Sequence, residues 1–395
     1  METRDFACGW IERTHRGEFF LKLIWCTTRH FGKDLCATTQ VSIINRLLSL
    51  GHEITVLGPD MPTETYEWEH VQLSQSSMKG RKGISLAKSI KTYLNEINLE
   101  ECIVFIDWPL VRYVSPLIEK NGIRWMCIDR SPPADANVLA KFQRIVWKKA
   151  WKMVAASLSR NGSCIGGMVV SAAHQRLIKN RFLIKTEKLY ILHAGVDNEL
   201  FQQNNQATFD TPLKLVYHGK LDRHRGILKL VLLLDELEKN GIEAELNLIG
   251  SGDLDLHLSN LANSKSNINF LTPIPHSDIG RTLQKYQIGL LPMPNLPVWT
   301  ISSPLKRSEY MSSGLLVLGI DHSGHELPTM NNNLDSYKLF DQQTFVENSV
   351  DQIQKWIEDG NYAKLSTEAR TYAEANLDWR ATIQPLADLL ESLEE

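Results

Sequence analysis

Two cations and one carboxylate in the C-terminal half stand out because of where they fall relative to predicted strand and helix ends. Lys220 and Arg225 lie in the segment HGKLDRHRGI, after an apolar run and between Gly219 and Gly226. Two cations in such a loop suit a diphosphate group and would stabilise it as a leaving group. Taken alone, the segment is equally compatible with an ordinary basic loop after a strand.

The carboxylate belongs to the segment SSPLKRSEYMSSGLLVLGI, residues 302–320. Ser303 can cap a helix whose first residue is Pro304, and Gly314 can end that helix in a left-handed conformation. The free amides of its first turn, from Ser303 to Leu305, would bind a phosphate. Glu309 on the second turn can accept two hydrogen bonds from a ribose diol. The alternative is a surface helix with a solvated glutamate.

Other polar residues give weaker signals. Asp107, in FIDWP at a strand end, is predicted to face a cleft and meet an acceptor hydroxyl, or else to form a turn. His30 is a candidate base or a solvated loop histidine. Asp253 and Asp255 form a D-x-D pair, but acids at a predicted helix start also favour the helix dipole. Because no histidine or cysteine pair has metal spacing, we predict no metal site.

These residues follow apolar runs that alternate with helical patterns. In the first half the candidate strands are 21–27, 53–59, 102–107, 123–129, 167–171 and 188–197. In the second half they are 213–219, 244–250, 268–273, 287–293 and 315–320. The polar segment 202–212 is the best linker. The order predicts two doubly wound α/β domains, whose strand ends would face a cleft where ligands bind.

Composition narrows the class of protein. The chain has 395 residues, 43% hydrophobic and 23% charged, which suits two globular domains. Its net charge is −3, from 43 Lys and Arg against 46 Asp and Glu, which excludes a wholly basic nucleic-acid binder. The six cysteines include no C-x-x-C pair, and the N-terminus lacks the apolar core of a signal peptide. We therefore expect a cytoplasmic protein without a transmembrane span.

Charge is unevenly distributed along the chain. Residues 136–186 contain ten Lys and Arg but no Asp or Glu, so the rest carries a net −13. A helical projection places apolar residues on one face, Trp147 and Trp151 at its edge, and Lys148 and Lys152 on the adjoining face. One interpretation is an interfacial helix that binds anionic lipid or an acceptor at the inner face of the membrane. The other is a helix packed on the sheet with a solvated basic face. Binding of nucleic acid is disfavoured because no groove-reading motif accompanies the charge.

The C-terminal half resembles the retaining GT-B glycosyltransferases of family 4, the glycosyl transferases group 1, which use nucleotide-sugar donors. The matching segments occur in the family's order from residue 191 to residue 379. They are ILHAGVDNELF, HGKLDRHRGI, LIGSGD, INFLTPIPHSDIGRTLQKYQIGLLPM, SPLKRSEYMSSGLLVLGI and YAEANLDW.

The resemblance assigns roles to individual residues. It places Lys220 and Arg225 on the donor diphosphate and Glu309 on the nucleotide ribose, where it is the second acid of a Glu-x7-Glu signature. The implied donor-binding set is Gly219, Lys220, Arg225, Gly250, Ser303, Pro304, Leu305 and Glu309. Three positions depart from the family: Ile301 replaces the first acid, the glycine-rich loop is reduced to Gly32, and Asp129 or Arg130 replaces a histidine.

The resemblance implies a GT-B fold with two Rossmann-like domains. The expected divisions are an acceptor domain at 1–201 with a poorly ordered extension at 1–20, a nucleotide-sugar domain at 213–377, and a helix at 378–395 that returns to the first domain. The implied activity is sugar transfer from a nucleotide-diphosphate sugar to a lipid-linked, polysaccharide or glycoconjugate acceptor, with retention and without an obligatory cofactor. A nucleotide-sugar epimerase and a non-catalytic subunit of the same architecture are the alternatives.

Overall fold

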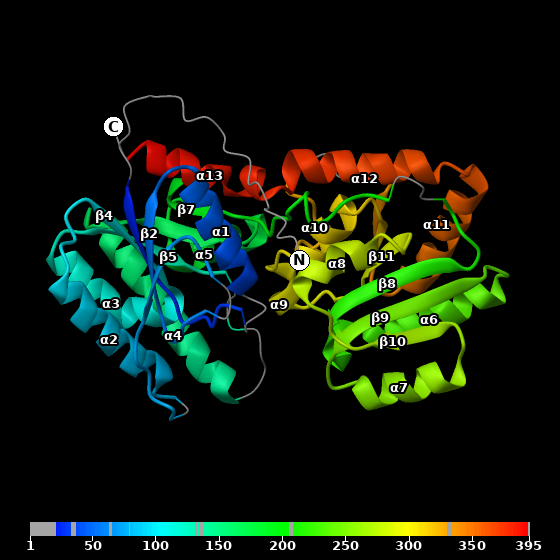
Figure 1. The fold of residues 1–395 in the computed structure, drawn as a ribbon, viewed down its shortest axis with the longest axis horizontal. Coiled ribbons are helices and arrows are strands. Elements are labelled where there is room, and N and C mark those ends of the chain that lie inside the picture. The colour runs from blue at the N-terminus through cyan, green and yellow to red at the C-terminus, as the bar shows by residue number, and fades with distance from the viewer. Residues whose placement is uncertain are drawn as a thin grey trace, which may run out of the picture.

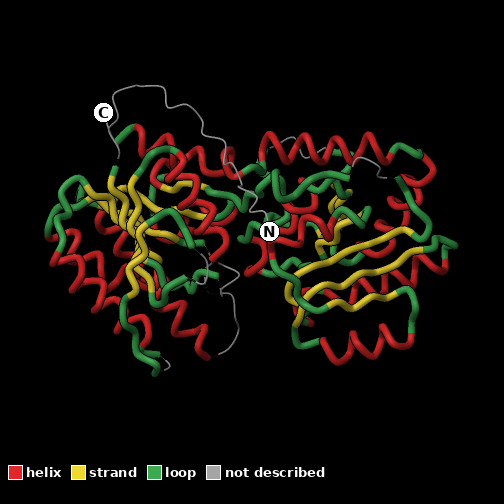
Figure 2. Tube along the Cα trace, viewed as in Figure 1, coloured by secondary structure: helices red, strands yellow, loops and turns green. Residues whose placement is uncertain are grey.

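The computed structural model describes residues 21–32, 37–62, 65–78, 80–130, 133, 138–204, 208–329 and 334–393. The chain forms two lobes, each built on a parallel β-sheet (Figures 1 and 2). The segment 1–20, predicted as an extension, lies outside the described residues, as do Cys8 and Cys36.

The N-terminal lobe contains a seven-stranded sheet. Its strands are β1 (Lys22–Cys26), β2 (Glu53–Gly58), β3 (Glu69–Gln72), β4 (Cys102–Asp107), β5 (Arg124–Ile128), β6 (Cys164–Val169) and β7 (Leu189–Ile191). They lie in the order β3-β2-β1-β4-β5-β6-β7 and run parallel. Because the order reverses between β1 and β4, the chain leaves these two strands toward opposite faces of the sheet, and in open α/β sheets ligands commonly bind beside the carboxyl ends of such a pair.

Helices cover both faces of this sheet. One face is packed by α2 (Lys82–Glu96), α3 (Trp108–Lys120), α4 (Val138–Ser159) and α5 (Ala172–Phe182). The other face carries α1 (Ala37–Ser49) and the last helix of the chain, α13 (Trp379–Glu391). Strands β1 and β4 are almost completely buried, as expected for parallel strands that are covered on both faces.

The C-terminal lobe repeats this design with six strands. They are β8 (Leu213–Lys220), β9 (Ala244–Ser251), β10 (Ile268–Leu271), β11 (Ile288–Leu291), β12 (Leu316–Ile320) and β13 (Tyr337–Phe340). The order β10-β9-β8-β11-β12-β13 places the reversal between β8 and β11. The helices are α6 (Ile227–Lys239), α7 (Asp255–Ser264), α8 (His276–Leu283), α9 (Pro297–Thr300), α10 (Leu305–Ser312), α11 (Phe345–Asp359) and α12 (Tyr362–Asn376).

The predicted fold class, two doubly wound α/β lobes of the GT-B type, is confirmed. The sequence prediction omitted β3 and β13, which are edge strands of four residues with mostly half-exposed side chains. Such strands have no apolar run to reveal them, because only part of each side is covered. Among the described residues, no helix combines the length and the apolar character that crossing a bilayer requires.

The chain passes between the lobes twice, and the two crossings lie against each other. Val196 forms a parallel bridge with Asp378, and its amide donates to the Leu377 carbonyl at 2.8 Å. Helix α13 then lies on the N-terminal lobe, next to α1 (Figure 1). We keep the domain boundaries 1–201, 213–377 and 378–395 as a proposal.

Helix α13 supplies part of the core of the N-terminal lobe. Ile383, Leu386 and Leu390 are buried in one cluster with Leu23 and Ile43. The helix begins where the Asp378 side chain accepts a hydrogen bond from the Arg380 amide. The last residues of the chain therefore stabilise a sheet that is built from its first residues.

We predict that Leu386→Ala lowers the free energy of unfolding of the N-terminal lobe by about 2–5 kcal/mol, because it leaves a cavity in this cluster. Hydrogen exchange should show the loss of protection in β1 and α1. Leu389→Ala on the same helix, where the side chain is only half-buried, should cost less. A loss confined to β8 and β11 would contradict the assignment of α13 to the first lobe.

Candidate active site

The predicted cation Lys220 stands at the carboxyl end of β8, at the reversal point of the C-terminal sheet. Two glycines shape the backbone there. A Cβ on Gly250 would lie 1.8 Å from the Gly219 carbonyl oxygen, and one on Gly219 would lie 2.8 Å from the Lys306 ammonium nitrogen. Both glycines have a positive φ, which side chains rarely adopt. They allow β8 and β9 to end close together and Lys306 to lie over the strand end.

The second predicted cation, Arg225, lies in the 3₁₀ turn Arg223–Arg225 that follows β8. Its Nε is 3.5 Å from Asp222 Oδ2, and its guanidinium carbon lies 4.7 Å from the centre of the Trp299 ring. The carboxylate and the aromatic face hold the side chain in place while it remains partly exposed. A charged group placed in advance loses less entropy when an anion binds.

The helix α10 carries Glu309, but it begins differently from the prediction. Its first residue is Leu305, and Pro304 precedes it without a side-chain cap. The Ser303 hydroxyl accepts hydrogen bonds from the Ala194 amide at 2.9 Å and from Arg307 Nη2 at 3.2 Å. The prediction that Ser303 caps the helix is therefore wrong: its oxygen is used by the segment that connects the lobes.

Glu309 is buried and contacts two histidines. Its Oε1 lies 3.0 Å from His276 Nε2, at the start of α8, and its Oε2 lies 3.0 Å from His218 Nε2, within β8. Burial alone would raise the pKa of Glu309, but the two histidines reverse this effect and hold the pKa well below its usual range. Burial also lowers the pKa of His218. The site thus contains an ionised carboxylate, which can accept hydrogen bonds, at the end of the sheet.

Sequence reasoning missed three residues of this site: Lys306, His218 and His276. Lys306 precedes Glu309 by one helical turn, and its ammonium lies 5.1 Å from the centre of the Tyr217 ring. The spacing i, i+3 places Lys306 and Glu309 on one helix face, so the sequence alone could have indicated that Lys306 belongs to the site. The histidines lie inside the quoted segments, but only the fold brings β8 and α8 to the same carboxylate.

Of the two candidate residues in the N-terminal lobe, His30 is partly exposed and Asp107 is buried. His30 is partly exposed after β1, and its Nδ1 lies 2.6 Å from Asp60 Oδ2. Asp107 is buried, and its oxygens accept hydrogen bonds from Thr27 Oγ1 at 2.9 Å, the Thr28 amide at 2.9 Å and Gln40 Nε2 at 2.8 Å. The prediction that Asp107 meets an acceptor is therefore wrong. Its carboxylate holds the loop after β1, and burial raises its pKa.

The tryptophans predicted for an acceptor or membrane face lie in the core. Trp147 Nε1 and Trp151 Nε1 both donate to the buried Asp129 Oδ2, at 2.5 and 2.8 Å, and both rings contact Phe182. A buried carboxylate needs such donors, which fixes this side of α4 toward the sheet. The prediction of a membrane-facing Trp147 and Trp151 is wrong, whereas Lys148 and Lys152 are exposed.

The D-x-D pair has a structural explanation. Asp255 Oδ1 accepts a hydrogen bond from the Gly252 amide at 2.6 Å, and Asp253 Oδ1 accepts one from the Arg223 amide at 2.7 Å. Both acids therefore stabilise the turns at the start of α7 and after β8. Within the described ranges, no group of three or more potential metal ligands occurs.

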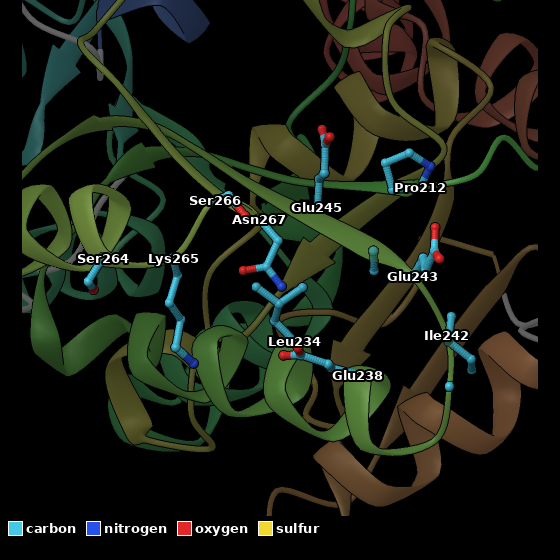
Figure 3. A pocket seen from close by; sticks show the side chains of 12 residues that line it. Pro212, Leu234, Glu238, Ile242, Glu243, Glu245, Ser264, Lys265, Ser266 and Asn267 are labelled. Carbon is cyan, nitrogen blue, oxygen red and sulfur yellow. The ribbon is translucent and has the colours of Figure 1, made fainter.

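A hollow of about 740 Å³ opens at the amino ends of the strands of the C-terminal sheet, on the side away from Lys220 (Figure 3). Its wall includes Glu243 and Glu245 near the start of β9 and Asn267 before β10. These residues lie at the amino ends of the strands, whereas Lys220 lies at a carboxyl end. The hollow contains none of the predicted site residues.

Two Rossmann-like lobes facing each other are the architecture of the GT-B class of glycosyltransferases. Residues 198–375 match the family described as glycosyl transferases group 1. This part of the chain is similar to that family, and the protein is a glycosyltransferase. No curated protein matches the sequence significantly.

Solved structures agree with the fold over nearly the whole chain. Sucrose-phosphate synthase from Thermosynechococcus elongatus is 15% identical, with a TM-score of 0.71 over 94% of this chain and 99% of that one. HepE from Anabaena, in complex with UDP and glucose, is 13% identical, with a TM-score of 0.68 over 94% and 100%. WaaG, a glycosyltransferase involved in lipopolysaccharide biosynthesis, is 13% identical, with a TM-score of 0.63 over 91% and 98%. At these identities the likeness establishes the fold alone.

The pKa of Lys306 leads us to expect that anion binding at this site depends on pH. Burial, reinforced by the charge of Arg225, lowers the pKa of Lys306 to about 8, although Glu309 acts in the opposite direction. The cationic form dominates below that pH and is the form that attracts a diphosphate. A bound anion favours the proton, so affinity should fall as the pH rises above about 8, by at most about tenfold per pH unit.

We predict that the affinity for UDP, measured by calorimetry, decreases between about pH 7 and about pH 9 and that Lys306→Arg removes most of this decrease. Arginine remains charged over this range. The control Lys229→Arg alters a lysine of α6 that donates to the Gln342 carbonyl and should retain the wild-type pH dependence. An unchanged profile in Lys306→Arg would show that another group titrates.

Proposed function

We propose that this glycosyltransferase transfers a sugar from a nucleotide-diphosphate sugar, held by the C-terminal lobe, to an acceptor hydroxyl held by the N-terminal lobe. The observation that carries the proposal is that Lys306 interacts electrostatically with Arg225 and Glu309 at the end of β8, the strand whose last residue is Lys220. Three cations suit a diphosphate, and an ionised buried carboxylate suits a ribose diol. The UDP and glucose in the similar HepE structure make a UDP-sugar the first donor to test.

The reaction breaks the bond between the anomeric carbon and a diphosphate oxygen and forms a bond from that carbon to the acceptor oxygen. The leaving diphosphate takes both electrons of the broken bond, and the three cations stabilise its growing charge. In a retaining transfer, the acceptor proton passes to the departing phosphate oxygen on the same face. This route requires no protein base, which agrees with Ile301 standing where the family has its first acid. We infer that no metal or cofactor is obligatory.

Glu309 must exchange partners when the ribose binds. Both of its oxygens contact histidines in the described structure, and His276 is the more exposed of the two, with 43% of its side chain accessible. A ribose diol would therefore replace His276 on one oxygen while His218 keeps its place behind the carboxylate. The two histidines hold Glu309 ionised and oriented before the nucleotide arrives.

We predict that Lys220→Ala and Arg225→Ala each lower kcat for sugar transfer by about 100- to 1,000-fold, because each removes a cation from the leaving diphosphate. Arg223→Ala is the matched control, since it removes an exposed arginine from the same turn. Transfer would be measured with radiolabelled UDP-sugars and a mixture of glycan and lipid-linked acceptors. Equal effects of all three substitutions would contradict a specific role for Lys220 and Arg225.

A second candidate, inverting transfer, is favoured by one observation in the N-terminal lobe. His30 Nδ1 lies 2.6 Å from Asp60 Oδ2, an arrangement in which the carboxylate orients the ring. His30 Nε2 would then take the acceptor proton while the acceptor oxygen attacks from the face opposite the diphosphate. Both groups follow the first two strands of that lobe and lie at its carboxyl edge.

The anomeric configuration of the product, determined by NMR, separates these routes. We expect retention, with His30→Gln and Asp60→Asn lowering kcat less than about tenfold, because a retaining transfer has no protein base to lose. Inversion together with a loss of about 100- to 10,000-fold in His30→Gln would establish the second route instead. Conversion of the donor to another sugar without any acceptor would identify an epimerase, and absence of nucleotide binding would identify a non-catalytic subunit.

The acceptor class is a further part of the proposal. A lipid-linked acceptor would be presented at a membrane surface, and the acid-free stretch 136–186 provides the positive charge that an anionic membrane attracts. We propose a cytoplasmic protein that associates peripherally with the inner face of the membrane. Nucleic acid is not among the proposed partners.

A further inference from the structure

Four large apolar side chains are exposed at the starts of two helices of the N-terminal lobe. Met78 and Ile84, which precede and begin α2, have 56% and 50% of their surface accessible. Phe142 and Ile145, on the first turns of α4, have 62% and 51%. We call these four residues and the exposed cations around them the α2/α4 rim.

The fold places the two helix starts at the same edge of the lobe. Helices α2 and α4 both run from the carboxyl ends of their strands back along the same face of a parallel sheet, and α3 packs against both. In Figure 1 the starts of α2 and α4 both lie at the lower edge of the left-hand lobe. This is the edge at which His30 and Asp60 are found, on the acceptor side of the proposed site.

The rim is positively charged. No Asp or Glu occurs in residues 70–95 or 136–186, which contain α2 without its last residue and all of α4. The exposed cations of the rim include Arg81, Lys82, Lys141, Arg144, Lys148, Lys149 and Lys152. Basic residues interspersed with exposed apolar side chains are what a helix needs to lie on an anionic bilayer, where the apolar groups enter the acyl boundary and the cations contact the headgroups.

The packing of α4 determines which residues can reach a bilayer. Trp147 and Trp151 are fixed inward by Asp129, so the middle of the helix cannot insert. The residues 141–145 that precede them are all exposed, and these include Phe142 and Ile145. The lysines argue against a protein partner, because lysine is depleted in the buried centre of protein interfaces.

We propose that the α2/α4 rim docks the N-terminal lobe on an anionic lipid surface, with Phe142 and Ile145 inserted beside the lysines. The docking would present the acceptor edge of the lobe to a lipid-linked substrate, so this role rests on the proposed function. The docking itself depends on the rim alone and can be measured without any donor or acceptor.

The test is co-sedimentation of the full chain with vesicles of phosphatidylcholine mixed with phosphatidylglycerol, and with vesicles of phosphatidylcholine alone. We expect binding to the anionic vesicles at low salt, weakened by high salt. The double substitution Phe142→Ser and Ile145→Ser should weaken the binding by about tenfold or more, since it removes both inserted side chains. Lys148→Glu with Lys149→Glu should weaken it by a comparable factor through charge.

The matched control is Leu256→Ser, because Leu256 is 78% exposed on α7 of the other lobe. It should bind vesicles as the wild type does. Thermal stabilisation by UDP, which should be unchanged in every rim variant, separates failure of docking from failure of the nucleotide site. The proposal is overturned if the wild type ignores anionic vesicles or if the double variant binds like the wild type. Self-association that light scattering detects and the double variant abolishes, without vesicle binding, would replace the membrane with a second copy of the chain.

Discussion

The burial of the Glu309 carboxylate is the constraint on which the geometry of the site depends. A buried ionised group is stable only when donors surround it, and here the donors come from β8 and α8. The contacts of this one carboxylate therefore hold β8, the start of α8 and the helix α10 together. Lys306 occupies the same face of α10 and lies over Gly219. Lys306 and the Glu309 carboxylate are therefore positioned by the same helix.

The remaining faces of α10 link this site to the connection between the lobes. Ser308 Oγ donates to the Ala194 carbonyl at 2.7 Å, and Ser312 Oγ donates to the Phe201 carbonyl at 2.8 Å. Between the lobes, Ser171 Oγ donates to the Ile301 carbonyl at 2.9 Å. The first lobe is thus held to the loop and helix that carry Glu309. A rotation of one lobe against the other would have to break or replace these hydrogen bonds, so the orientation of the lobes and the position of the helix that carries Glu309 depend on each other.

The sequence was sufficient to predict the fold class and the strand end that carries the proposed donor site. Apolar runs revealed the buried central strands, and parallel order brought Lys220 and Arg225 to the edge of α10 without any knowledge of contacts. It was insufficient where a residue's role depends on a distant partner. Nothing near Asp107 in the chain shows that Thr27 and Gln40 will occupy its oxygens. In the same way, His276 reaches Glu309 across 33 positions that only the fold brings together.

The helix α4 shows why periodicity alone cannot orient an amphipathic segment. A helical projection gives the relative directions of the side chains but not which direction faces the sheet. Trp147 and Trp151 lie four residues apart, on one side of the helix, and either a membrane or a buried acceptor could satisfy their indole groups. Asp129, at the end of β5, decides between them, because both indoles donate to it. Once that side is fixed inward, the first turns of the helix extend beyond the packed core, and their apolar side chains are left exposed beside the lysines. The same buried carboxylate that removes the tryptophans from the surface therefore determines which residues remain on it.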